Sequence, residues 1–264
     1  MALSSSCSVA FLAMARAAQS GVLIVRANRQ DKEFHFQNWV ESRLSDAELR
    51  HDGSGRNTYP DFTLVDWPEG YEVKGLAWPG RESNYDSNSR VPSGEHNGRQ
   101  VFYVFGRYPA NVEENEYPLV DLVVCHGDFL NANHDYVHKN RNFKGFGSYG
   151  DIMVRDRKMY VAPTPFALTQ GTTGQQTLIV PTGIGVKDDL EAVGELVRTE
   201  TEDIVIGYEF DLTTNELTPK LAPNPSAGKR HAFTAYRMRG SGGGEVTMRS
   251  QPDIVATIEA DVAG

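Results

Sequence analysis

The chain has 264 residues, of which 39% are hydrophobic and 23% charged, a balance typical of a globular protein that is long enough to bury its own core. Its formal net charge of −9 argues against a protein whose whole surface binds nucleic acid, although an acidic back is compatible with a local basic face. The two cysteines, Cys7 and Cys125, have no partners at metal-ligand spacing and predict reduced thiols rather than a disulfide framework.

The N-terminal part of the chain predicts two helices. Residues 8–18 are apolar, but Arg16 interrupts the run and no basic residue precedes it, so we expect a helix that packs on the core rather than a signal segment. Residues 31–44 place apolar side chains, among them Trp39 and Leu44, roughly on one helical face. No stretch is long enough to span a membrane, and we expect a cytoplasmic protein that has no membrane partner.

Short apolar runs of strand length follow. Residues 62–67 and 71–76 flank a turn at 68–70 and predict a β-hairpin. A long polar excursion at 79–99 comes directly after this hairpin. Further strands are expected at residues 101–107, 119–126, 151–155, 159–162, 177–180 and 204–210.

The C-terminal part predicts one more helix and a connector. Residues 188–198 space Leu190, Val193 and Val197 so that they share one side of a helix. The glycine-rich residues 239–245 predict a flexible connector before a tail that forms a late strand or an arm. These elements together predict an α/β fold.

The expected hairpin at residues 62–76 contains candidate catalytic residues. Alternate side chains of a strand share a face, so Glu72 and Lys74 are neighbours while Val73 points into the core. Asp61 opens the preceding strand and comes within reach of Glu72. Two carboxylates and the backbone carbonyl of Val73 form an all-oxygen site of the kind that Mg²⁺ prefers. A metal ion there activates water toward a phosphodiester, and Lys74 orients or helps to deprotonate that water.

This pattern resembles the PD-(D/E)xK nuclease superfamily, which includes most Type II restriction endonucleases. The matching residues are Pro60-Asp61 and, after an eleven-residue step from 61 to 72, Glu72-Val73-Lys74. The resemblance is close over residues 33–76 and implies a restriction-endonuclease-like central mixed β-sheet flanked by helices. In that family a helix before the motif often supplies another acidic residue, and Glu41 matches that position.

Two similar patterns in the chain act as internal controls. Pro252-Asp253 is a second Pro-Asp pair, but no acid-x-Lys triplet follows it. The triplet Asp156-Arg157-Lys158 follows Asp151 too closely for two full strands, and it lacks an apolar middle residue. Context therefore favours the first match, whereas motif matches alone carry a risk of chance agreement.

Candidate DNA contacts lie in three polar segments. The excursion at 79–99 leaves from the catalytic strand and carries residue types that read base edges, namely Arg81, Asn84, Asn88, Ser89 and Arg90. Basic residues that could hold phosphates follow at Lys139, Arg141 and Lys144. A second basic group comprises Lys229, Arg230, Arg237 and Arg239. Ordinary polar surface is the alternative interpretation for each segment.

These elements and motifs together predict the domain organisation and the function of the chain. Residues 1–264 form a single nuclease domain with a catalytic core at about 31–165 and a C-terminal elaboration at 200–264. The resemblance implies a Mg²⁺-dependent endonuclease that cuts double-stranded DNA at a specific sequence, as a homodimer with one active site for each strand. One alternative is a repair, junction-resolving or modification-dependent nuclease of the same superfamily. A non-catalytic DNA-binding or scaffold protein is the other.

Overall fold

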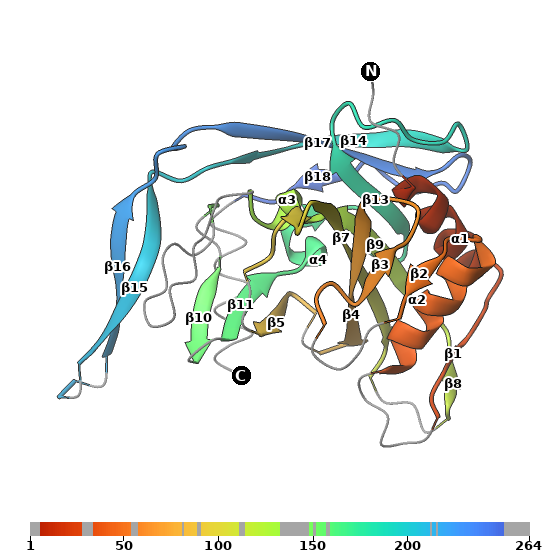
Figure 1. Ribbon diagram of the computed structural model, residues 1–264, viewed down its shortest axis with the longest axis horizontal. Coiled ribbons are helices and arrows are strands. Elements are labelled where there is room, and N and C mark those ends of the chain that lie inside the picture. Colours follow the sequence, from red (N-terminus) through yellow and green to blue (C-terminus); the bar gives the residue numbers. More distant parts are fainter. Residues whose placement is uncertain are drawn as a thin grey trace.

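A nine-stranded mixed sheet forms the centre of the fold, in the order β14-β17-β13-β9-β7-β4-β3-β2, with β6 paired to β7 (Figure 1). Its strands are β2 (His51–Asp52), β3 (Phe62–Leu64), β4 (Glu69–Trp78), β6 (Glu95–His96), β7 (Arg99–Pro109), β9 (Asp121–His126), β13 (Gln176–Pro181), β14 (Leu190–Thr199) and β17 (Arg230–Met238). The pairs β4–β7 and β9–β13 are parallel and the others antiparallel. The computed structural model describes residues 6–27, 34–53, 58–80, 82–88, 91–110, 114–132, 148–149, 152–156, 159–211, 213–214 and 216–250.

Both faces of the centre of this sheet are buried, and β7 shows why. Its side chains alternate between two cores: Phe102 and Val104 pack into one, and Tyr103 and Phe105 into the other. The near-continuous apolar run in this strand is what burial on both faces requires.

Different elements cover the two faces. Helices α1 (Cys7–Gln19) and α2 (Phe34–Asp46) cover the face toward which Phe102 points, here called the helical face (Figure 1). The opposite face is covered by the short helices α3 (Gly127–Leu130) and α4 (Pro165–Leu168) and by a small sheet. That sheet has the order β10-β11-β5, with β10 (Met153–Asp156), β11 (Met159–Pro163) and β5 (Asn84–Asn88).

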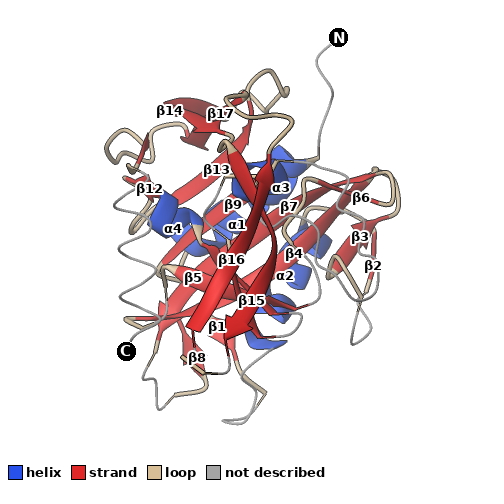
Figure 2. Cartoon of the chain, turned by 90° about the vertical axis from the view of Figure 1, so that its left-hand side faces the viewer, coloured by secondary structure: helices blue, strands red, loops and turns tan. Residues whose placement is uncertain are grey.

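Three further pairs of strands lie outside the central sheet. β1 (Ile24–Val25) pairs with β8 (Glu116–Tyr117), and β12 (Thr169–Gln170) pairs with β18 (Thr247–Met248). β15 (Asp203–Asp211) and β16 (Glu216–Pro223) form a hairpin that projects from the body in Figure 1 and comes toward the viewer in Figure 2.

Most of the expected elements are present. The two N-terminal helices are confirmed as α1 and α2, and the expected hairpin is confirmed as β3 and β4. The expected strands at 101–107, 119–126 and 177–180 are central strands of the sheet. In the part of the chain that the structure describes, no helix has both the length and the apolar character to cross a membrane.

The helix expected at 188–198 is wrong, because this segment is the strand β14. It pairs with β17 from Leu190 to Thr199, with a bulge between Ala192 and Gly194. Burial alternates from Leu196 onward, with Leu196 buried and Val197 exposed. A long antiparallel ladder with a distant strand therefore outweighs the local helical spacing, which is a weak signal by itself.

Two expected loops are also more ordered than expected. The excursion at 79–99 contains β5 and β6. The backbone of β5 pairs with β11, and the backbone of β6 pairs with β7, although the residues of both strands are polar. The connector at 239–245 is held by Arg237, which is fully buried and donates hydrogen bonds to the carbonyl oxygens of Gly242 and Gly244. Arg237 of the second basic group is therefore not placed to contact DNA, because its side chain is buried and its guanidinium is bonded to backbone carbonyl oxygens.

Candidate active site

The β3–β4 hairpin sets the position of Asp61. The register pairs Phe62 with Tyr71, so the next position sets Asp61 opposite Glu72. Pro60 packs against Gly70 in the facing strand, where a Cβ would overlap the proline ring. Glycine at position 70 therefore lets the chain enter β3 closely enough to bring Asp61 to β4.

A backbone hydrogen bond holds the Asp61 carboxylate. The amide of Val73 donates to Oδ2 of Asp61 at 2.8 Å. The N–H and C=O groups of one strand residue point to the same side, so the carbonyl of Val73 also faces the edge of β4 at which Asp61 lies. The side chain of Val73 packs into the core on the helical face, as the alternation of side chains along a strand predicts.

Glu72 and Lys74 project from the opposite face of the sheet. Nζ of Lys74 donates to Oε1 of Glu72 at 2.6 Å, and Glu72 is only 9% exposed. Oε2 of Glu72 is buried and has no hydrogen-bond partner among the residues that the structure describes. A buried carboxylate oxygen without a donor is costly, so this atom points to a cation or water that completes its coordination.

The electrostatics agree with this geometry. Burial, and next the neighbouring Glu72 carboxylate, raise the pKa of Asp61 to about 6, while the Val73 amide and the Lys74 ammonium act in the other direction. Two carboxylates that share one site repel each other in this way. A strongly shifted carboxyl beside a specific charged partner is typical of functional sites.

Tyrosines surround the carboxylates. Tyr103 on β7 lies opposite Glu72 in the parallel pairing, and its hydroxyl is 2.8 Å from that of Tyr59. Burial, and next the neighbours Tyr59 and Tyr85, raise the pKa of Tyr103 well above its usual value. Nζ of Lys74 lies 5.9 Å from the centre of the Tyr85 ring. Tyr85 and Tyr103 are buried, so they give the charged groups a less polar surrounding on this side, which strengthens electrostatic interactions.

The residues present fit a magnesium site. Asp61, Glu72 and the Val73 carbonyl supply oxygen atoms only, the donor set that this hard cation prefers. Oε2 of Glu72 has no hydrogen-bond partner among the described residues, and burial together with the nearby Glu72 carboxylate raises the pKa of Asp61, both of which are compatible with a cation between the two carboxylates.

Glu41 is not grouped with Asp61 and Glu72. It lies on α2, its side chain is 44% exposed, and Oε1 is 3.8 Å from Nε2 of His51. In the described ranges, no three His, Cys, Asp or Glu side chains form a group that could hold a metal ion. The physical reason is that α2 packs on the helical face, whereas Glu72 projects from the other face.

The structure describes few of the candidate DNA contacts. Asn84 is buried on β5, and only the backbone of Asn88 is described. Lys229, Arg230 and Arg239 of the second basic group are exposed, and the other candidates lie outside the described residues, namely Arg81, Ser89, Arg90, Lys139, Arg141 and Lys144. Their roles stay predictions.

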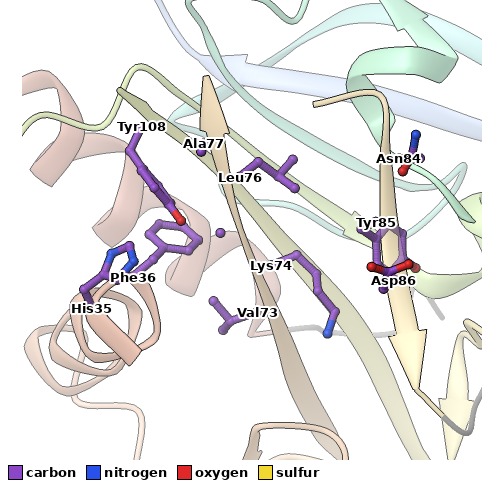
Figure 3. Close-up of a pocket in the computed structure, with 11 residues that line it drawn as sticks. His35, Phe36, Val73, Lys74, Leu76, Ala77, Asn84, Tyr85, Asp86 and Tyr108 are labelled. Carbon is purple, nitrogen blue, oxygen red and sulfur yellow. The ribbon is translucent and has the colours of Figure 1, made fainter. Parts of the chain in front are cut away.

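A pocket that the sequence did not indicate adjoins Lys74 (Figure 3). Its lining includes Tyr85 and Asp86 from β5 and Tyr108 from the end of β7. No spacing in the sequence predicts this grouping, because the β5–β11 and β4–β7 pairings that create it are long-range.

Comparison with known proteins finds no match: no family model matches the sequence, and no curated protein or solved structure is significantly similar to it.

Proposed function

We propose that this protein is a Mg²⁺-dependent endonuclease that hydrolyses phosphodiester bonds in double-stranded DNA. The observation that supports it best is the meeting of Asp61 and Glu72 beside Lys74, with one oxygen of Glu72 buried and unpartnered. The same residues carry the resemblance to the PD-(D/E)xK superfamily. The finer proposals of a restriction-endonuclease-like sheet and a site-specific homodimer rest on that resemblance.

Each residue has a distinct task in the proposed reaction. Asp61, Glu72 and the carbonyl of Val73 would hold Mg²⁺. The bound ion supplies Lewis acidity, which lowers the pKa of a water ligand and offsets charge on the phosphate. Lys74 has its ammonium 2.6 Å from Oε1 of Glu72, so it can donate to the attacking water or to a phosphate oxygen at the same edge.

The deciding experiment is a cleavage assay. Plasmid and phage DNA are incubated with the wild-type protein, with Asp61→Ala and with Lys74→Ala, in Mg²⁺ and in EDTA. Asp203→Ala and Lys187→Ala are matched controls, because both residues are exposed, Asp203 lies on the β15–β16 hairpin outside the central sheet, and Lys187 lies outside the β3–β4 hairpin. Discrete fragments that require Mg²⁺ and vanish only in the site variants would support a sequence-specific endonuclease.

The other outcomes separate the alternatives. A smear of fragments that still depends on Asp61 and Lys74 would favour a repair or junction-resolving nuclease of the same chemistry. Equal behaviour of wild type and site variants would reject the catalytic assignment and leave a DNA-binding or scaffold protein.

A further inference from the structure

The pocket beside Lys74 has the size and lining of a binding site for one planar molecule. Its volume is about 390 Å³, toward the lower end of the roughly 300–1,000 Å³ of small-molecule pockets. Figure 3 shows its two sides: Phe36 and Tyr108 beyond one side of β4, and Asn84, Tyr85 and Asp86 on β5 beyond the other.

The floor of the pocket is the backbone of β4. Gly75 lies there, and a Cβ at this position would approach Tyr108 Cε1 to 3.0 Å and Phe36 Cβ to 3.2 Å. β3 pairs with β4 only at Phe62–Tyr71 and Thr63–Gly70, so no described strand covers this edge of β4 beyond Val73. Phe36 and Tyr108 close the pocket on the helical face and Tyr85 lines it from the other face, so a flat group that enters at this open edge of β4 meets aromatic side chains of the kind on which proteins stack nucleobases.

The polar side chains of the pocket include acceptors for a ligand that carries hydrogen-bond donors. The Asp86 carboxylate can only accept hydrogen bonds when ionised, and the Asn84 amide both donates and accepts. A base with an exocyclic amino group offers the donor that a carboxylate takes, as in the pairing of Asp or Glu with cytosine.

We propose that this pocket binds a single nucleobase outside the DNA stack, and that Asp86 selects a base with an amino group. This proposal rests on the proposed nuclease function. Lys74 lines the pocket and also contacts Glu72, so a nucleotide whose base occupies the pocket has its backbone close to the carboxylates. A stacked base cannot enter such a pocket, so the substrate has an unpaired nucleotide or one that rotates out of the duplex.

Binding to four duplexes in EDTA tests the proposal. They share one sequence and are fully paired, or carry an unpaired cytosine, an unpaired thymine or an abasic site at one position. We expect fluorescence anisotropy to show about tenfold tighter binding of the unpaired cytosine than of the abasic duplex. Asp86→Asn should lower the preference for cytosine over thymine by about tenfold and leave binding of the paired duplex unchanged. Asp203→Asn, at an exposed residue of the β15–β16 hairpin, is the control.

Contrary outcomes distinguish the two proposals. Equal binding of cytosine and abasic duplexes by the wild type, with Mg²⁺-dependent plasmid cleavage intact, would overturn the base pocket alone. Failure to bind or cleave any DNA would overturn both. If Asp86→Asn does not fold by circular dichroism, the wild-type comparison of cytosine with the abasic duplex still decides. If the protein rapidly cleaves a duplex with an unpaired nucleotide but not the paired duplex, the bound base comes from a nucleotide that is already unpaired and not from one that rotates out of a base pair.

Discussion

The amide of Val73 donates a 2.8 Å hydrogen bond to Oδ2 of Asp61. This bond ties the residue before β3 to the middle of the strand that carries Glu72 and Lys74. The relative position of the two carboxylates therefore depends on the hairpin itself and not on a flexible loop, which is what a preorganised metal site needs.

Metal binding should stabilise the fold. A ligand that binds only the folded state at about 100 times its Kd adds about 2.7 kcal/mol to the free energy of unfolding. We expect thermal denaturation to show a higher Tm in Mg²⁺ than in EDTA, and Glu72→Gln to abolish the difference because it removes a carboxylate ligand. Asp203→Asn, at an exposed carboxylate on β15, should keep the full shift. The same shift in Glu72→Gln and wild type would contradict a site at Glu72.

Asp61 should make the metal-free protein less stable as the pH rises. Its folded pKa of about 6 lies above the ordinary 3.8, so the unfolded state releases its proton first. The contribution of Asp61 to the free energy of unfolding is complete below pH 4. It falls by about 1–3 kcal/mol as the pH rises through 6.

The variant Asp61→Asn isolates this effect, because its amide oxygen can still accept the Val73 N–H. In EDTA at pH 7.5, chemical denaturation should find Asp61→Asn more stable than wild type, and the difference should close toward pH 4. A constant difference across this range would show that Asp61 does not titrate in this way. Cleavage by Asp61→Asn should be lost throughout.

Lys74 should act in the chemical step. Lys74→Ala is expected to lower kcat by about 10²–10⁴-fold, the usual contribution of a positioned proton-transfer group. Its effect on DNA affinity should be small by comparison, because one lysine is a minor share of the phosphate contacts. Single-turnover cleavage and anisotropy binding separate the two effects, and a loss confined to binding would argue for a purely electrostatic lysine.

Gly70 should be required for the site although it bears no functional group. Gly70→Ala places a methyl group against Pro60, and overpacking of this kind costs about 1–3 kcal/mol. The displacement of Pro60 also moves Asp61, so we expect lower cleavage in the fraction that remains folded. Gly244→Ala is the control, because a Cβ there meets no atom within 4 Å. Full activity in Gly70→Ala would show that Asp61 is placed by other contacts.

The buried pair Arg107–Asp121 should hold β7 to β9. Nε of Arg107 donates to Oδ1 of Asp121 at 2.9 Å, Asp121 is fully buried, and the Gly174 amide donates to its Oδ2 at 2.9 Å. Asp121→Ala strands a buried guanidinium and should lower the unfolding free energy by about 3–5 kcal/mol. Asp66→Ala, which breaks an exposed pair, should change it little. Urea denaturation measures both, and equal effects would contradict the role of burial.

The sequence predicted the hairpin and its chemistry because both are local. Glu72 and Lys74 share a face through the two-residue period of a strand, and Asp61 reaches them through one short turn. The helical spacing at 188–198 was equally local, yet it misled because β17, more than thirty residues further on, pairs with that segment. Glu41 was assigned by its position before the motif, and the sequence carries no sign of the face on which α2 packs.

The sequence by itself therefore determined which residues meet in the hairpin and which acid-base chemistry they can support. Only the tertiary structure decided what surrounds them: Tyr103 beside Glu72, Asp86 and Tyr108 around Lys74, and α2 on the other face from Glu72. The physical reason is the range of the interactions. Strand alternation and turn geometry act within a few residues, whereas parallel pairing and burial join segments whose register no local pattern records.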